Sequence, residues 1–182
     1  FIMIEVVFFF SVHHNNDPGA IYNNVKEADK TKEFRNLVSK YLSMRNHAHI
    51  MDNDSETNAQ HQNRIKPGAG SVLLDIHFNA SANTGATGTE MIVSKSASKN
   101  SIAMATTLVN ETAKILGIKN RGVKSETETA RGKIAILNKG AGVAVLAEIC
   151  FISNPSDMVQ YELHKEALAC FFADTLIKYD NK

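Results

Sequence analysis

The sequence predicts an α/β fold in which helices flank a mixed, mainly parallel β-sheet, within a single domain that spans residues 1–182. Apolar stretches of strand length alternate along the chain with amphipathic stretches of helix length, which is the pattern of a layered α/β protein. Several strand-like stretches are apolar nearly throughout, as expected of strands buried on both faces of a parallel sheet. The chain contains no internal repeat or linker that would divide it.

The N-terminal part of the chain predicts a strand, a loop and a helix, in that order. Residues 1–12 are rich in Ile, Val and Phe, which favours a buried strand, and a polar loop follows. Asn24 is expected to cap the helix, because Glu27 follows it three positions later, as in a capping box. Apolar residues then recur at helical spacing over residues 34–42.

The rest of the chain continues this alternation. A polar helix is predicted over residues 55–66, a second helix over 101–116, and one or two closing helices over 157–179. Gly117 is expected to end the second of these. Residues 119–133 form a basic, polar stretch. Further strands are predicted over residues 47–51, 72–78, 88–94, 133–137 and 143–151.

Charge and apolar content exclude several classes of function. Twenty Lys and Arg balance nineteen Asp and Glu, and the basic stretch 119–133 has no interleaved aromatic residues, so nucleic acid is not an expected partner. The longest apolar run, residues 1–10, is far shorter than the roughly 20 residues of a transmembrane helix, and it lacks the features of a signal peptide. Cys150 and Cys170 lie in apolar stretches and are expected to be reduced, buried thiols.

Ionisable residues lie in or directly after the apolar strands, where an unpaired charge is costly. His13 follows the first strand, Asp75 and His77 lie within a second, and Glu148 lies within a third. Because the carboxyl ends of parallel strands meet at one edge of a sheet, we expect His13, His77 and Glu148 to lie close together. The helix after the first strand begins at that same edge, which adds Glu27 to the group.

These residue types suit a catalytic zinc site. Two imidazoles and a carboxylate, from His13, His77 and Glu27, make a three-ligand set that leaves one position for water or substrate. Glu148 would then be the catalytic base. Asp75 alternates in phase with His77, so its carboxylate is expected to accept a hydrogen bond from the metal-bound imidazole.

Each residue also has a simpler interpretation. Glu27 alone is a helix-capping residue, His13 alone is a loop histidine, and Asp75 with His77 forms a buried ion pair. Glu148 is harder to explain in this way, because a lone acid in a nine-residue apolar strand is uncommon without a partner. A single shared site accounts for all of these positions together.

The motifs that carry these residues resemble the zinc-dependent N-acetylmuramoyl-L-alanine amidases of the amidase-3 type, over almost the whole chain. The matching segments are His13-His14-Asn15-Asn16-Asp17-Pro18-Gly19-Ala20, Glu27, Asp75-Ile76-His77-Phe78-Asn79-Ala80, Gly88-Thr89-Glu90 and Glu148-Ile149-Cys150-Phe151-Ile152-Ser153-Asn154.

The resemblance implies a phosphorylase/hydrolase-like α/β fold and hydrolysis of the amide bond between N-acetylmuramic acid and L-alanine in peptidoglycan. It also implies zinc as the cofactor, His13, Glu27 and His77 as its ligands and Glu148 as the catalytic acid. The chain departs from the family pattern at His14-Asn15, where Gly-Gly is usual, at Asp75, where Ser is common, and at Cys150, where Gly is common. His14 competes with His13 as a ligand, but the spacing to Asp17 favours His13.

The expected partner is therefore peptidoglycan or a muropeptide, acted on by a monomer without a transmembrane segment. Such a substrate places the protein outside the cytoplasmic membrane, in the periplasm, in the cell wall or secreted, or makes it a phage-type lysin. Three alternatives stay open. These are a zinc peptidase or carboxypeptidase-like hydrolase, a non-catalytic cell-wall-binding module on the same fold, and a plain structural domain.

Overall fold

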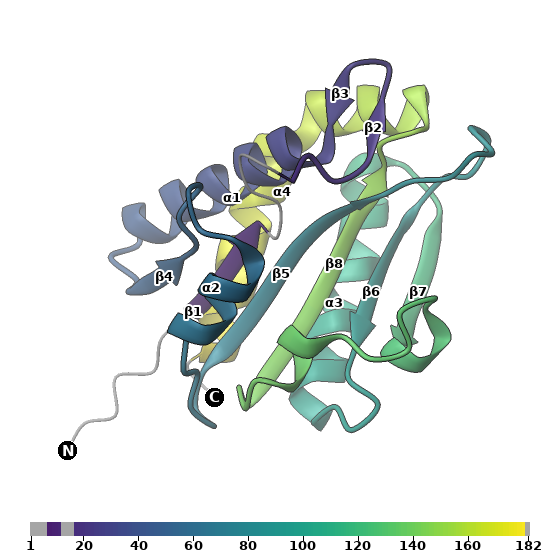
Figure 1. The fold of residues 1–182 in the computed structure, drawn as a ribbon. Coiled ribbons are helices and arrows are strands. Elements are labelled where there is room, and N and C mark those ends of the chain that lie inside the picture. Colours follow the sequence, from purple (N-terminus) through teal and green to yellow (C-terminus); the bar gives the residue numbers. More distant parts are fainter. Residues whose placement is uncertain (1–6, 12–16, 181–182) are drawn as a thin grey trace.

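A twisted six-stranded β-sheet forms the middle of the molecule in the computed structural model, which describes residues 7–11 and 17–180 (Figure 1). The strands are ordered β4-β1-β5-β8-β6-β7, and all neighbours are parallel except β8 and β6. This arrangement confirms the predicted mixed, mainly parallel sheet. The strand bounds are β1 Val7–Ser11, β4 His49–Met51, β5 Val72–Asn79, β6 Thr89–Val93, β7 Asn120–Ser125 and β8 Val143–Phe151.

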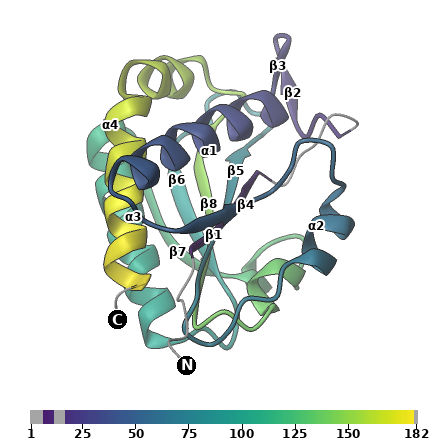
Figure 2. The same cartoon turned by 90° about the vertical axis from the view of Figure 1, so that its left-hand side faces the viewer.

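Helices cover the two faces of the sheet unequally (Figure 2). The long helices α1 (Glu27–Met44), α3 (Lys99–Leu116) and α4 (Pro155–Asp180) pack on one face. The short helix α2 (Asn58–Arg64) lies over the other face, where the 3₁₀ turn η2 (Ala135–Asn138) contacts β8.

The apolar core is divided by the sheet in the same unequal way. The larger cluster includes Leu74 and Ile76 of β5 together with residues of α1, α3 and α4. The smaller cluster, on the face of α2, includes Leu73 and Leu146. Because side chains alternate along a strand, Asp75 and His77 share the face of Leu73, and Glu148 shares the face of Leu146. The ionisable residues of β5 and β8 therefore point away from the three long helices.

Two glycines are required by the backbone. Gly117 ends α3 in the left-handed conformation, with φ of 63°, as predicted. Gly88, just before β6, has φ of 115°, and a Cβ there would lie 2.4 Å from the carbonyl oxygen of Lys119. Any other residue at position 88 would push β7 away from β6, because Lys119 directly precedes β7.

The predicted cap at Asn24 is wrong. Asn23 and Asn24 have φ of 46° and 63°, and they form the turn of a small hairpin between β2 (Ile21–Tyr22) and β3 (Val25–Lys26). Asparagine tolerates the left-handed backbone of such turns. Helix α1 begins at Glu27, and its N-cap residue Lys26 makes no side-chain cap.

One strand was not predicted from the sequence, and one predicted strand is wrong. Residues 120–125 form the edge strand β7, which is polar and half-exposed and so lacks an apolar pattern. Residues 133–137, predicted as a strand, contain the start of η2 instead. Ile136 and Leu137 are buried there, but they pack over the sheet rather than pair with it.

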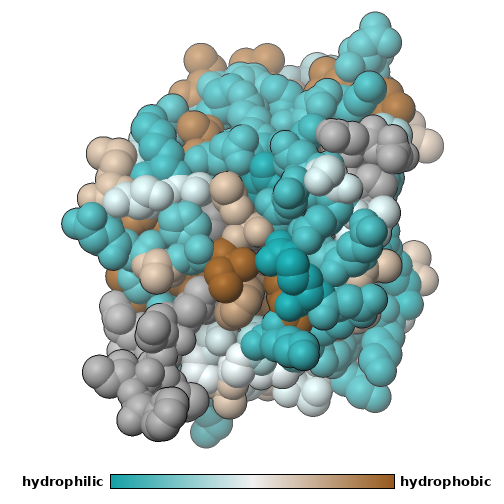
Figure 3. All heavy atoms as spheres, turned by 60° about the vertical axis from the view of Figure 1, so that its left-hand side comes forward, coloured by the Kyte–Doolittle hydropathy of each residue, from teal (hydrophilic) through white to brown (hydrophobic). Residues whose placement is uncertain are grey.

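The closing segment forms one continuous helix, α4, which is among the outcomes the sequence predicts. None of the helices within residues 7–11 and 17–180 combines the length and the hydrophobicity needed to cross a bilayer. Figure 3 shows one face of the molecule, on which hydrophilic residues predominate and the coloured hydrophobic residues form small, separated groups.

Candidate active site

The sheet brings His77 and Glu148 side by side. His77 of β5 pairs in register with Glu148 of β8, and Glu90 of β6 pairs with Glu148 from the other side. All three lie near one edge of the sheet, where β5 and β8 end and the antiparallel β6 begins. The predicted convergence of His77 and Glu148 at a strand edge is therefore observed. His13 lies outside the described residues, as does His14.

Glu27 reaches this edge from the first turn of α1. Its side chain is buried, and its Oε1 atom lies 3.1 Å from Nδ1 of His77. Oε1 also accepts a hydrogen bond from the amide of Phe78, and Oε2 accepts one from the amide of Ala20. The carboxylate thus fixes the start of α1 against β5 and the preceding loop. A role confined to capping its own helix does not explain these contacts.

Asp75 holds the opposite side of the His77 ring. Its Oδ2 atom lies 3.2 Å from Nε2 of His77, and the Asp75 side chain is fully buried. Burial opposes a charge on His77, but the Asp75 carboxylate and the hydrogen bonds to Asp75 and Glu27 outweigh it, so the pKa of His77 lies above its ordinary value. The predicted contact between Asp75 and His77 is present, and both ring nitrogens face a carboxylate.

Glu148 is half-buried on the floor of the site, and its Oε2 atom has no hydrogen-bond partner among the described residues. Burial raises the pKa of Glu148 to about 7. The imidazole of His77 opposes this rise, whereas the carboxylates of Glu27 and Glu90 add to it. A carboxyl group with these properties is suited to exchanging protons near neutral pH.

The residues present fit a zinc ion. Two ligands on one tetrahedral zinc are separated by about 3.3 Å, given bond lengths near 2.0–2.1 Å. Nδ1 of His77 and Oε1 of Glu27 are 3.1 Å apart, and Asp75 holds Nε2 in the way that carboxylates hold metal-bound imidazoles. Within residues 7–11 and 17–180, no group of three or more His, Cys, Asp or Glu side chains is placed to hold a metal. The predicted third ligand, His13, lies outside those ranges.

A cleft runs past Glu148 on both sides. Two hollows, of about 290 and about 400 Å³, adjoin there, and both are lined by His77, Asn79, Arg131 and Glu148. The first extends towards Lys124 on β7, and the second extends towards Gly19 in the loop before the hairpin. Together these hollows fall within the size range of ligand-binding clefts, about 300–1,000 Å³.

Sequence reasoning missed an ionic cluster on one wall of this cleft. The buried carboxylate of Glu90 accepts hydrogen bonds from Nε of Arg121 at 2.7 Å and from Nζ of Lys124 at 2.6 Å. Burial favours the neutral form of Glu90, but these two cations outweigh it and hold its pKa below the ordinary value. Glu90 is an acid in an apolar strand, which is the same signal that identifies Glu148.

Arg131 belongs to the basic stretch 119–133 that the sequence shows, but its place in the cleft was not predicted. It is an exposed residue between η1 (Glu126–Glu128) and η2, and it lines both hollows. Arg121 and Lys124 belong to the same basic stretch, and their contact with Glu90 was not predicted because they lie on the unpredicted strand β7.

Fold and cleft together define an α/β domain with a histidine–carboxylate cluster at the edge of a mainly parallel sheet. The chain belongs to the N-acetylmuramoyl-L-alanine amidase family, whose model matches residues 9–168. This match confirms the resemblance found in the sequence motifs.

Known proteins similar to this chain agree with that assignment. N-acetylmuramoyl-L-alanine amidase LytC of Bacillus subtilis (strain 168) is 24% identical over 181 residues, which are 96% of this chain and 35% of that protein. The chain thus spans about a third of the length of this relative. The crystal structure of an N-acetylmuramoyl-L-alanine amidase from Clostridium difficile 630 superposes on this chain with a TM-score of 0.81 at 21% identity. The superposition covers 98% of each chain.

The catalytic domain of CwlV, an N-acetylmuramoyl-L-alanine amidase from Bacillus (Paenibacillus) polymyxa var. colistinus, has a TM-score of 0.79 at 21% identity, with 97% of this chain and 98% of that chain covered. At these identities the structural similarity establishes the shared fold.

Proposed function

We propose that this chain hydrolyses the amide bond between N-acetylmuramic acid and L-alanine in peptidoglycan, with a zinc ion held by His13, Glu27 and His77. The observation that carries the proposal is the contact of Glu27 with His77 beside Glu148, on the floor of a cleft, in a member of this amidase family. The chemistry that zinc supplies when bound is polarisation of the scissile carbonyl and a lowered pKa, about 7, for the attacking water.

Glu148 moves the proton in this proposal. Its carboxylate takes a proton from the attacking water as the oxygen bonds to the scissile carbonyl carbon. The same carboxyl group then gives that proton to the alanine nitrogen as the carbon–nitrogen bond breaks. The products are the lactyl carboxylate of the sugar and the free amine of the stem peptide. No covalent bond to the protein forms.

The surrounding residues hold the reacting groups in place. Asp75 and Glu27 fix the His77 ring from opposite sides, which restricts its orientation. The amides of Phe78 and Ala20 fix the carboxylate of Glu27 in turn. The two hollows on either side of Glu148 would receive the glycan and the stem peptide.

The substrate determines where the protein works. Peptidoglycan or its muropeptide fragments would be cut outside the cytoplasmic membrane, in the periplasm, in the cell wall or after secretion. A phage-type lysin that reaches the wall from within the cell is the other setting for this activity. We propose a monomer as the working form, because the cleft is built by one chain.

Mass spectrometry of muropeptide digests tests the proposed function. The protein is incubated with purified peptidoglycan, with and without a chelator, and the products are compared with those of Glu148→Gln and His77→Ala. We expect free stem peptides that begin with L-alanine, from the untreated protein only. His77→Ala should also lose zinc, whereas Glu148→Gln should retain it.

Two results would replace this proposal by an alternative. Cleavage of ordinary dipeptides in preference to muramoyl-peptides would indicate a zinc peptidase or carboxypeptidase-like hydrolase. Binding to peptidoglycan without cleavage and without zinc at neutral pH would indicate a wall-binding module.

A further inference from the structure

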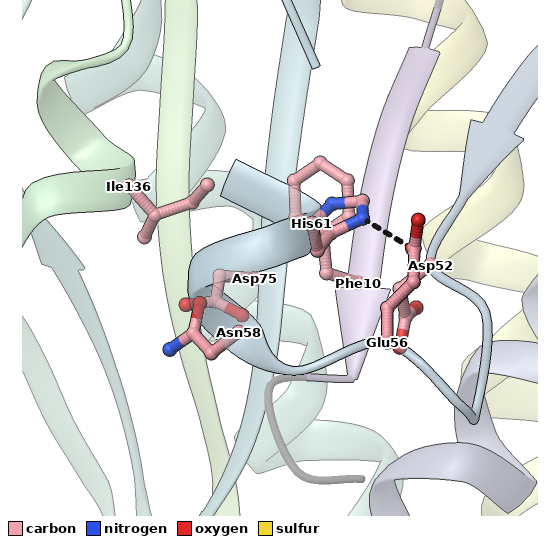
Figure 4. Close-up of a pocket in the computed structure, with 7 residues that line it drawn as sticks. All are labelled: Phe10, Asp52, Glu56, Asn58, His61, Asp75 and Ile136. Atoms are coloured by element: carbon pink, nitrogen blue, oxygen red, sulfur yellow. Dashed lines mark hydrogen bonds and ion pairs between the residues drawn. The ribbon is translucent and has the colours of Figure 1, made fainter. Parts of the chain in front are cut away.

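A small cavity is lined by Asp75 and not by His77 (Figure 4). It lies between α2 and the sheet and has a volume of about 10 Å³, close to the 10–15 Å³ that one water molecule requires. Its walls are mainly polar, which favours water over an empty space. The lining residues are Phe10, Asp52, Glu56, Asn58, His61, Asp75 and Ile136.

Two polar atoms in the cavity wall are buried without a hydrogen-bond partner in the described part of the chain. One is Oδ1 of Asp75, whose other oxygen contacts His77. The other is Nε2 of His61, on α2. Both side chains are buried, with exposed fractions of 1% for Asp75 and 4% for His61. Such atoms are normally satisfied by protein or by an ordered water.

The ring of His61 is held firmly from its other sides. It packs on the ring of Phe10, with 4.2 Å between ring centroids. Its Nδ1 atom lies 3.3 Å from Oε2 of Glu56 and 3.2 Å from a guanidinium nitrogen of Arg64. Arg64 also donates two hydrogen bonds to Glu56, at 2.6 and 2.9 Å. Because Nδ1 contacts Glu56 and Arg64, Nε2 is the ring nitrogen that is available to a group in the cavity.

We propose that one water molecule in this cavity bridges Nε2 of His61 and Oδ1 of Asp75, which makes His61 a positioning residue for His77. The water donates one hydrogen bond to the Asp75 carboxylate. It then either donates its second hydrogen to Nε2 of His61 or accepts a hydrogen bond from it, and its remaining capacity serves other polar groups of the wall. Asp75 is then held at both oxygens, and its rotation about the Cβ–Cγ bond is restricted. The carboxylate of Asp75 therefore holds the His77 ring more rigidly than it would without the water.

This inference rests on the proposed function, because it assigns His61 a role towards a zinc ligand. Helix α2 contributes no residue to either hollow of the active-site cleft. Its effect on the site would pass through the water and Asp75. Zinc affinity and the state of the His77 ring are therefore the properties to measure.

The first test is the affinity of the folded protein for Zn²⁺, measured by competition with a chelator. His61→Phe removes Nε2 and retains the aromatic contact with Phe10. Changes to groups that hold a metal ligand typically lower metal affinity about 10–100-fold, and we expect His61→Phe to fall near the low end of that range. His61→Gln retains a polar group near the position of Nε2 and should restore most of the affinity.

A double-mutant cycle separates positioning from a general loss of structure. If His61 acts through Asp75, His61→Phe should have no further effect on zinc affinity in an Asp75→Ala background. His49→Phe is a matched control, since it removes an imidazole that contacts Ser39 and does not line the cavity. It should leave zinc affinity unchanged. Equal losses from His61→Phe with and without Asp75 would overturn the proposal.

A second measurement does not depend on zinc. The ¹⁵N NMR signals of the His77 ring report on its tautomer and hydrogen bonds, and His61→Phe should shift them in the metal-free protein. Unchanged His77 signals in a folded His61→Phe variant would contradict the inference. If His61→Phe shifts these signals but the wild-type protein releases no stem peptides, the proposed function is refuted and the positioning role stands.

Discussion

The two faces of the sheet differ in what their side chains do, although the same strands supply both. On β5, Leu74 and Ile76 pack against the long helices, whereas Asp75 and His77 lie on the opposite face among carboxylates. The difference shows that one strand packs against the long helices through one face and provides the candidate chemistry through the other, where Leu73 is also buried in the smaller apolar cluster. We call the face under α1, α3 and α4 the helix-covered face, and the face that carries Asp75, His77 and Glu148 the cleft face. Changes to the helix-covered face should alter the free energy of unfolding, and changes to the ionisable residues of the cleft face should alter turnover.

The largest expected effect is on the cleft face. Glu148→Gln keeps the size and shape of the side chain but cannot take up or return a proton. General acid–base groups contribute about 10²–10⁴-fold to rate, so kcat on muropeptides should fall by at least this factor. The midpoint of urea unfolding should change little. A Glu148→Gln variant with wild-type turnover would refute the role assigned to this residue.

The matching change on the helix-covered face is Leu74→Ala, one residue before Asp75 on the same strand. Leu74 is fully buried, and truncation of such residues costs about 2–5 kcal/mol of unfolding free energy. Urea unfolding measures this loss. At temperatures where the variant remains folded, its kcat/KM should stay close to that of the wild type. A stable but inactive Leu74→Ala protein would show that the two faces are not independent.

A smaller effect is expected at the cleft wall. The guanidinium of Arg131 has no ion-pair partner among residues 7–11 and 17–180, and it lines both hollows. If the proposed function holds, Arg131 is placed to attract a carboxylate of the stem peptide. Arg131→Ala should raise KM about tenfold, equal to roughly 1.4 kcal/mol, with little change in kcat.

The control for this variant is Lys133→Ala. Lys133 is an exposed cation two residues away that lines neither hollow. Equal effects of the two substitutions would indicate a general influence of charge rather than a specific contact.

The smallest effect concerns the ion pair beneath α2. The hydrogen bonds from Arg64 lower the pKa of Glu56 to about 2. A lowered pKa stabilises the fold above the ordinary pKa near 4.5, and this contribution is lost as the pH falls towards 2. The pair is partly exposed, so the contribution is about 1 kcal/mol or less. Urea unfolding between pH 5 and pH 2 measures this contribution. Over that range the unfolding free energy of Glu56→Gln should fall less than that of the wild type, by about 1 kcal/mol or less.

The sequence allows the frame of the site to be predicted, because its strongest signals are local. Apolar runs identify β5 and β8, and Gly117 marks the end of α3. A general rule about strand ends then places His77 and Glu148 together. The contact of Asp75 with His77 follows from strand alternation alone.

Features that depend on tertiary pairing escape such reasoning. Strand β7 is recognisable only through its pairing with β6, and the contact of Arg121 and Lys124 with Glu90 is missed with it. The burial of Asp52 follows from its ion pair with Arg35 on α1, whereas the local sequence suggests an exposed turn. His61 is similarly surrounded by polar sequence, and only the packing of α2 on Phe10 buries it.

The reversed direction of β6 has a consequence for how the cleft is bounded. Since β5 ends and β6 begins at the same edge, residues 80–88 connect them across the end of β8 without a crossover helix (Figure 1). Insertions or deletions that leave Ala86, Thr87 and Gly88 in place would lengthen or shorten the rim beside Glu148 and keep the hydrogen bonds that join this connection to Asn154 and Asp157 at the start of α4. Substrate reach can thus be adjusted separately from the stability of the domain.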